Sequence, residues 1–370
     1  MKRTKLLALF GSICLILALT VSFTGLGSVL ADNPQDELPP GIAKKVEPEP
    51  ELLPPSTQPL VILSGSDYEM GYQYGYQAAE GMNWFKNKLW AEMLGEEPGA
   101  YYAMGGWTEE EVYEILQGFQ YYIREYTPEF IDIFKGMADG STAAGYPISY
   151  ADALLMNAEW DMEVATSEEA NYPEPVEPLP PHHCSSFAAW GDETSEDAVI
   201  TIHSEDDPFA YTMGAVVFPD EGNNVIQGGG EAGTWAFTYL QNDKGLFIGL
   251  TASPAKRDVD NQFGLPVNLS LFHLARYCDT AEEAKDMLLS FKLTCGYIYL
   301  ICDSDGDCYA IETTGALKSV RTAGDFGEKD FLVITNHYIT EEMQDSQGTI
   351  KPTSSTARRY EQLFDNLTEY

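Results

Sequence analysis

The sequence predicts an α+β fold, in which a helical first half is followed by a β-rich second half that ends in a helix. Apolar residues recur at helical spacing in the first half, whereas short extended runs of β-branched and aromatic residues follow Cys184. Residues 171–181 contain prolines at five positions and separate the two halves, because proline interrupts both helices and central strands. Strands, helices, strands and a last helix, in that order, are typical of two stacked sheets with helices outside.

The helices of the first half are predicted from their capping patterns. A Ser or Thr followed three residues later by an acid marks a helix start, because both side chains accept hydrogen bonds from unpaired backbone amides. One such helix is expected from Ser66 through Leu94, and another starts at residues 127–129, where a proline fits the first turn. The capping pairs are Ser66 with Glu69, Thr108 with Glu111, and Ser149 with Asp152.

The second half is predicted to contain two groups of strands separated by helices. Each run is short and rich in residues that favour strands. The first group comprises residues 186–190, 199–203, 215–218, 235–240 and 246–251. Helices are expected around Leu269 to Tyr277 and after Thr280. The later strands are residues 297–302, 309–313 and 331–335, and the final helix begins at Thr356.

Four segments are expected along the chain. Residues 1–31 are built like a signal peptide, with a basic start, an uncharged apolar run and small residues before a cleavage point. An uncleaved segment would instead anchor the protein in a membrane, because the run has nearly the length of a spanning helix. Residues 32–59 form a linker rich in proline and acids, 60–183 a helical pro-segment, and 184–370 the β-rich catalytic chain. The protein is therefore expected to be secreted.

The net charge indicates which partners the protein disfavours, and the cysteines indicate which disulfides it could form. The formal net charge is −37, and loss of the three basic residues of the signal segment lowers it to −40, which disfavours nucleic acids and anionic membranes as partners. Five of the six cysteines follow the signal segment. The simplest pairing in an exported protein joins Cys302 to Cys308 and Cys278 to Cys295, which leaves Cys184. A chain without these crosslinks is equally compatible with the sequence.

Cys184 stands between the proline-rich stretch and the first strand of the second half. Cleavage of the bond before it would turn Cys184 into an amino terminus. Its α-amino group, with an unperturbed pKa near ~8, could then take the proton of its own thiol at neutral pH. The alternative for a cysteine in isolation is an ordinary buried or disulfide-bonded residue.

Several stretches in sequence order resemble the isopenicillin N acyltransferase family, the acyl-CoA:6-aminopenicillanic acid acyltransferases. The wider kin of this family include bile-salt hydrolases, penicillin V acylases and phospholipase B-like proteins. The stretches are GSDYEMGYQYGYQAAEG from Gly65, TPEFIDIFKGMADGSTAAGYPISYADALLMNAEWD from Thr127, HCSSFAAWG from His183, HSEDD from His203, NDKGLFIG from Asn242, ICDSDGDCYAIET from Ile301, TNHY from Thr335 and STARRYEQL from Ser355.

The resemblance implies a four-layer αββα sandwich of the N-terminal nucleophile (Ntn) hydrolase superfamily, and an autoproteolytic thiol enzyme of the peptidase C45 type. It implies that the chain breaks between His183 and Cys184, and that Cys184 then carries the acyl group as a thioester. Asp206 matches the family aspartate that orients the new amino group. His203 stands where some relatives carry an arginine.

Two further residues are expected at the site from the same resemblance. Asn336 matches the asparagine whose amide donates to the oxyanion of the tetrahedral intermediate, a contact worth roughly 3 kcal/mol of barrier. Arg359 matches an arginine near the nucleophile. The adjacent Arg358 is the alternative, because one residue turns a helical side chain by about 100°.

The expected function is that of a secreted, autoproteolytic N-terminal cysteine hydrolase or acyltransferase, which cleaves carboxamide bonds of a small-molecule or lipid acyl substrate. N-acylated amino compounds are the first substrate class expected. One alternative is a phospholipase B-like lipid ester hydrolase, and another is an inactive secreted binding protein of the same fold, favoured if Cys184 forms a disulfide. No cofactor and no metal are expected, because the five histidines lack ligand spacing and Asp305-Gly306 reads as a hairpin turn.

Overall fold

The structure is a computed structural model that describes residues 59–96, 106–166, 184–195, 198–206, 211–220, 222–235, 238–253, 255–256, 259–260 and 262–368. The predicted signal segment, the proline-rich stretch, His183 and nearly all of the predicted linker lie outside these residues. Within the described ranges, no helix has the length and apolar character needed to cross a membrane.

The first half is helical, as predicted. The helices are α2 (Asp67–Gln77), α3 (Ala79–Met93), α4 (Glu109–Tyr126), α5 (Glu129–Ala143) and α6 (Tyr150–Thr166). Capping boxes form at Ser66 and Thr108, which confirms both predicted starts. The single helix expected from Ser66 to Leu94 is wrong, because the backbone leaves the helical region at Ala78 and separates α2 from α3.

The break at Ala78 ends a helix that packs unusually close to α5. A Cβ atom at Gly71 or Gly75 would overlap with carbonyl groups of α5, and a Cβ atom at Gly136 or Gly140 would overlap with the backbone of α2. These glycines recur every four residues on both helices, so the two backbones touch without side chains between them. The periodicity of apolar residues alone does not reveal such a contact.

The strands form two sheets in the described part of the chain. The large sheet has the order β1-β4-β5-β6-β7-β8-β9-β10, in which β1 is parallel to β4 and the other neighbours are antiparallel. Its strands are β1 (Leu60–Gly65), β4 (Thr212–Pro219), β5 (Ile226–Glu231), β6 (Tyr239–Asn242), β7 (Phe247–Ala252), β8 (Tyr297–Cys302), β9 (Cys308–Thr313) and β10 (Lys318–Arg321). The small antiparallel sheet has the order β11-β2-β3, with β2 (Ser185–Ala189), β3 (Ile200–Ser204) and β11 (Phe331–Ile334).

Most predicted strands are confirmed within a few residues, but the one expected from Trp235 is wrong. Strand β6 begins at Tyr239. Trp235 precedes this strand in a loop, and its indole is fully buried. Three strands were not predicted: β1, β5 and β10. The glycine run in β5 is untypical of a strand, so the sequence pattern did not predict one. Glycine is nevertheless needed at Gly229, because a Cβ atom there would overlap with the hydroxyl of Tyr239.

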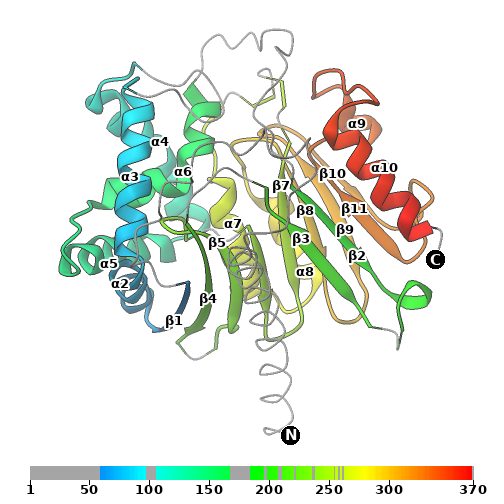
Figure 1. Ribbon diagram of the computed structural model, residues 1–370, viewed down its shortest axis with the longest axis horizontal. Coiled ribbons are helices and arrows are strands. Elements are labelled where there is room, and N and C mark those ends of the chain that lie inside the picture. Colours follow the sequence, from blue (N-terminus) through cyan, green and yellow to red (C-terminus); the bar gives the residue numbers. More distant parts are fainter. Residues whose placement is uncertain are drawn as a thin grey trace, which may run out of the picture. The chain divides into compact units, whose positions relative to one another are not determined.

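The layers follow the predicted αββα order (Figure 1). A cluster of apolar side chains that includes Ala188, Leu300 and Leu332 lies between the two sheets. Helices α7 (Val267–Tyr277) and α8 (Ala281–Ser290) cover the outer face of the large sheet. Helix α10 (Ser355–Thr368) lies on the outer face of the small sheet, against β2 and β11, and the short helix α9 (Glu341–Gln344) precedes it.

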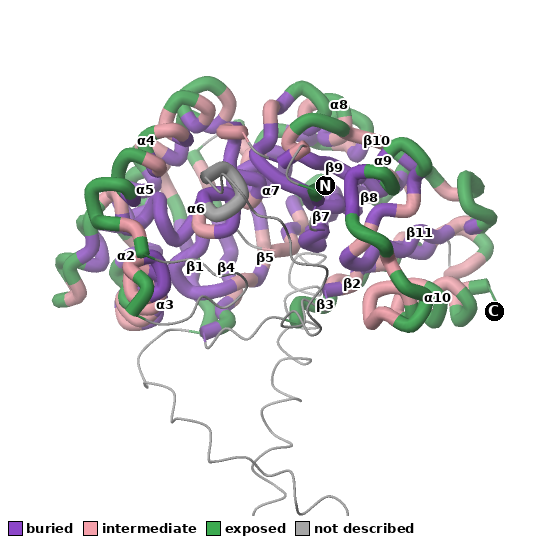
Figure 2. The backbone as a smooth tube through the Cα atoms, turned by 90° about the horizontal axis from the view of Figure 1, so that it is seen from above, coloured by how far each residue is buried: buried purple, intermediate pink, exposed green. Residues whose placement is uncertain are grey.

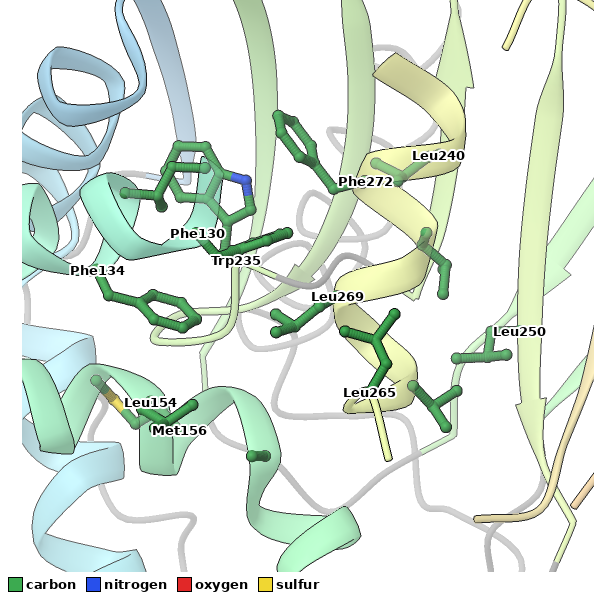
Figure 3. Packing of buried hydrophobic residues seen from close by; sticks show 14 of the residues in the cluster. Phe130, Phe134, Leu154, Met156, Trp235, Leu240, Leu250, Leu265, Leu269 and Phe272 are labelled. Carbon is green, nitrogen blue, oxygen red and sulfur yellow. The ribbon is translucent and has the colours of Figure 1, made fainter. Parts of the chain in front are cut away.

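The largest core joins the helical half to the large sheet. Strand β7 is buried along its whole length, β4 and β5 are buried at about half of their residues, and exposed residues lie on the outer sides of the helices (Figure 2). In this core the Trp235 ring packs against Phe272 of α7, with ring centroids 5.6 Å apart (Figure 3). The same ring packs against Tyr74 of α2, with ring centroids 5.3 Å apart. The helical half therefore contributes β1 and much of the core to the same compact unit.

One predicted disulfide is confirmed and the other is wrong. Cys302 and Cys308 are joined across the β8–β9 hairpin. Cys278 and Cys295 are thiols in different contacts, since Sγ of Cys278 lies 3.8 Å from Sδ of Met287 and Sγ of Cys295 lies 3.4 Å from Oδ1 of Asp161. They lie at the end of α7 and before β8, so spacing along the chain gave no guide to their partners.

The hairpin turn predicted at Asp305-Gly306 is confirmed. Gly306 has φ of 91°, a conformation that glycine adopts at no steric cost. The Asp303 carboxylate accepts the backbone amides of Asp305 and Asp307 and also that of Ala281, the first residue of α8. Both of its oxygens therefore fix the turn and the start of a helix.

Candidate active site

Cys184 immediately precedes β2, the central strand of the small sheet. Because β2 is antiparallel to both neighbours, its start lies beside the ends of β3 and β11, where Ser185 pairs with Ser204 and Ser186 with Ile334. Antiparallel pairing thus gathers residues that lie up to 175 positions apart in the sequence. The Cys184 side chain is buried, and its Sγ lies 3.4 Å from Oε1 of Glu205, just beyond the end of β3.

Glu205 continues into a chain of hydrogen bonds. Its Oε2 is 2.9 Å from Nε2 of His203, and Nδ1 of the same imidazole is 2.7 Å from Oγ of Ser186. An ionised carboxylate can only accept, so Nε2–H donates to Glu205 and Nδ1 accepts from the serine hydroxyl. The His203 ring also lies against Tyr239, with centroids 5.5 Å apart. His203 is therefore linked to the thiol by way of Glu205, and the hydrogen bonds at both ring nitrogens fix the orientation of its imidazole.

Arg359 reaches the same point from α10. Its Nη1 donates to the carbonyl oxygen of Cys184 at 2.5 Å and to Oγ of Ser185 at 2.6 Å, while Nη2 donates to Oδ1 of Asn336 at 2.8 Å. The adjacent Arg358 is exposed. Of the two arginines that the sequence left open, Arg359 is the one beside Cys184.

Asn336 lies two residues after β11 and is nearly buried. Because a guanidinium only donates, its contact with Arg359 identifies the atom facing it as Oδ1. Its Nδ2 donates to the carbonyl oxygen of Ala252 at the end of β7, at 2.8 Å. One amide hydrogen is thus used to hold the side chain, and the amide has a second hydrogen to offer.

Two other predicted site residues are Asp206 and His183. Asp206 is exposed, and its charge only partly offsets the burial that lowers the pKa of Arg359. His183, on the other side of the predicted cleavage point, lies outside the described residues. Glu205 was not among the residues expected from the sequence. It shares the two-residue period of His203, whereas Asp206 does not, and this period points to the site once the pairing of Ser186 with His203 is known.

The charges of the site act on one another. Burial raises the pKa of Glu205, but the hydrogen bond and charge of His203, together with the hydrogen bond from Cys184, leave the pKa below its ordinary value. Burial lowers the pKa of Arg359, against the opposing charges of Cys184 and Asp206. The site therefore presents a carboxylate at the Cys184 thiol and a guanidinium at the Cys184 carbonyl oxygen.

Metal-binding clusters are not formed by the His, Cys, Asp and Glu side chains that the structure describes. The described histidines lie apart and have other partners. His203 contacts Ser186 and Glu205, His273 contacts Glu129, and His337 contacts Thr335 and Thr356. Burial, followed by the charges of Arg321 and Arg359, lowers the pKa of His337 to about 4, so this ring is neutral at neutral pH.

The second half of the chain matches a known family. Residues 196–370 match the family model described as acyl-coenzyme A:6-aminopenicillanic acid acyl-transferase. The matched range contains Asn336 and Arg359, and Cys184 lies shortly before it. An uncharacterized protein of Archaeoglobus fulgidus is 25% identical over 316 residues, which cover 77% of this chain and 51% of that protein. This chain thus spans about half the length of that relative.

Solved structures also resemble parts of the chain. A Caenorhabditis elegans N-acylethanolamine-hydrolyzing acid amidase ortholog is 17% identical with a TM-score of 0.35, over 42% of this chain and 71% of that one. A penicillin V acylase from Agrobacterium tumefaciens is 14% identical with a TM-score of 0.24, over 44% and 46%. A Clostridium perfringens conjugated bile acid hydrolase mutant is 16% identical with a TM-score of 0.25, over 43% and 46%. The family match agrees with the resemblance found in the sequence.

Proposed function

We propose that this protein, whose residues 196–370 match the acyl-coenzyme A:6-aminopenicillanic acid acyl-transferase family, is a secreted, self-processing thiol hydrolase that cleaves N-acyl carboxamide bonds. Cys184 is the nucleophile, and the acyl group passes through a thioester on its sulfur. Water is the expected acceptor outside the cell, and another amine in its place would make the protein a transferase.

One observation carries this proposal. The Cys184 thiol, the Glu205 carboxylate, the Arg359 guanidinium and the Asn336 amide meet at one end of the small sheet, although they come from four separate parts of the chain. A thiol that will attack a carbonyl needs a proton acceptor, a fixed position and donors for the oxyanion. Each of these requirements has a candidate here, and a buried structural cysteine needs none of them.

Maturation is part of the proposal, because it creates the second base of the site. Before cleavage the α-nitrogen of Cys184 is an amide and cannot accept a proton. We expect the thiol to attack the preceding carbonyl in an N-to-S shift, after which water opens the thioester and leaves a free α-amine. That amine, with an ordinary pKa near ~8, then takes the thiol proton in each catalytic cycle, and Asp206 is expected to orient it.

Processing is tested by the mass of the exported protein. Wild type should yield two fragments, the second with Cys184 at its amino terminus, and Cys184→Ala should remain one chain because it lacks the nucleophile. Cys184→Ser should be cut slowly, because a hydroxyl is the weaker nucleophile. Cys278→Ala is the matched control, since that thiol lies far from the cleavage point along the chain and should not affect cutting.

One result would contradict self-processing. If Cys184→Ala were cut at the same bond, an external protease would be responsible. The same samples test export, because a cleaved signal segment would leave a new amino terminus near Asp32.

A further inference from the structure

We propose that Glu205 takes the proton of the Cys184 thiol during maturation, at the stage when the α-nitrogen of Cys184 is still an amide. The proposal rests on the proposed function and deepens it, because it assigns a proton acceptor to the one step for which the α-amine does not yet exist.

The two-residue period of the small sheet places Glu205 against the thiol. Ser186 pairs with His203 across β2 and β3, and both point toward the large sheet. Cys184 and Glu205 continue these two rows by two residues each, and Sγ of Cys184 meets Oε1 of Glu205 at 3.4 Å. An acid one position earlier or later would point to the opposite face.

The carboxylate is held for this contact by its second oxygen. His203 donates to Oε2, and Ser186 fixes the other ring nitrogen of His203. The Ser186 side chain lies between the sheets, next to Gly249, and its hydroxyl is engaged by the His203 ring. His203 and Ser186 are therefore positioning residues, and Glu205 is the one in contact with the reacting atom.

The step balances without any group that the protein lacks. The thiol proton moves to Oε1 of Glu205 while sulfur forms a bond to the carbonyl carbon of residue 183. The carbon–nitrogen bond then breaks, and the protonated Glu205 returns the proton to the leaving α-nitrogen. Water hydrolyses the thioester, giving a carboxylate at residue 183, a restored thiol and an α-amine, and the proton left over from water goes to that amine or to solvent. Because ordinary thiol and Glu pKa values differ by about four units, the proton moves as the new bond forms.

The other charged groups near Glu205 are not alternatives to it. Arg359 cannot be deprotonated and donates to the Cys184 carbonyl oxygen. Tyr239 is a weak acid whose pKa burial raises further, with a smaller contribution from the charge of Glu205. Asp206 lies one position off the row that Glu205 continues, and its charge acts on Arg359.

The test follows self-cleavage of the full-length chain after a short pulse of cell-free synthesis, on a denaturing reducing gel. Glu205→Gln should slow the appearance of the Cys184 fragment by about 100-fold or more, since general acid–base groups contribute about 10² to 10⁴. Gln keeps the shape and can still accept a hydrogen bond, but it cannot take a proton. Glu205→Asp should retain part of the rate, and Glu361→Gln, the same change at an exposed position of α10, should match wild type.

The outcomes separate this proposal from the proposed function. If wild type cuts itself and Glu205→Gln cuts at the same rate, Glu205 is not the acceptor, and slowing in Asp206→Asn alone would give the role to Asp206. If wild type does not cut itself, the proposed function fails at maturation and this proposal fails with it. Melting temperatures of the variants within a few degrees of wild type would show that slow cutting is not misfolding.

A second measurement confines Glu205 to the stage before cleavage. Replacing residues 180–183 by Ile-Glu-Gly-Arg lets factor Xa cut directly before Cys184. After that cut, the iodoacetamide labelling rate of Cys184 in the Glu205→Gln chain should lie within a few-fold of the rate in the matching Glu205 chain, because the α-amine now serves as the base. A thiol that remained 100-fold less reactive after the cut would overturn the assignment to maturation.

Discussion

Two thiol–carboxyl contacts of the same length lie in this protein, and they have opposite surroundings. Sγ of Cys184 is 3.4 Å from Glu205, and Sγ of Cys295 is 3.4 Å from Asp161. The Glu205 side chain is 30% exposed, whereas Asp161 is 1% exposed within the main core. The distance between sulfur and oxygen therefore does not distinguish a site from a packed interior.

The two carboxyl groups differ in charge state for a physical reason. Burial raises the pKa of Asp161 to about 7, and the Val267 amide, Cys295 and Thr294 offset this only in part. Glu205 has an imidazole on one oxygen, and its pKa falls below the ordinary value. Full burial of Asp161, against the imidazole partner of Glu205, separates the core contact from the candidate site.

The largest loss is expected from removing the oxyanion donor, which the core contact does not have. Asn336→Ala should lower turnover by about 100-fold or more, because a donor aimed at the developing oxyanion is worth roughly 3 kcal/mol. Steady-state kinetics on an N-acyl substrate would measure it, with circular dichroism as the check on folding. Unchanged turnover would transfer the oxyanion role to backbone amides.

A smaller loss is expected from removing the guanidinium. Arg359→Ala deletes charged hydrogen bonds to Cys184, Ser185 and Asn336, so turnover should fall between roughly 10- and 100-fold. Arg358→Ala makes the same chemical change at an exposed position one residue away and should leave turnover unaltered. Equal losses in the two variants would mean that α10 contributes only its packing.

How much of this was predictable depends on the kind of pattern involved. Cap residues and turn residues are local. The capping pairs predicted the starts of α2 and α4, and Asp305-Gly306 predicted the hairpin after β8. The break at Ala78 and the strand through Gly228–Gly230 depend on close contacts with distant residues, which no local pattern contains.

The residues of the candidate site also divide into those that the sequence predicted and those that only the structure reveals. Cys184, Asn336 and Arg359 were expected from the family resemblance, and the structure brings them together, while their catalytic roles stay predictions. Glu205 was passed over because it stands in a run of three acids, Glu205 to Asp207, in which composition cannot choose. The strand period chooses, but only once the pairing of Ser186 with His203 is known.

The core contact gives the smallest effect on activity and a distinct effect on stability. Since the pKa of Asp161 is about 7 in the folded chain and near 3.8 when unfolded, stability is fully present below about pH 4 and is lost as the pH rises toward 7. The slope is on the order of 1.4 kcal/mol per pH unit. Asp161→Asn should remove this slope, unfold at higher temperature at pH 7 and keep wild-type turnover.

Thermal unfolding between pH 4 and pH 8 would measure the difference. Curves for wild type and Asp161→Asn that run parallel would show that Asp161 is ionised in the folded protein.

The most direct test of the central claim is to trap the acyl group. Wild-type protein would be mixed with an N-acyl substrate that it hydrolyses and quenched in acid within the first turnover. The protein would then be digested and analysed by mass spectrometry. The peptide beginning at Cys184 should carry the mass of the acyl group, and hydroxylamine should remove it, as expected of a thioester. Product formation with the acyl group on another residue, or with the Cys184 peptide unmodified at every quench time, would contradict the assignment of Cys184 as the nucleophile.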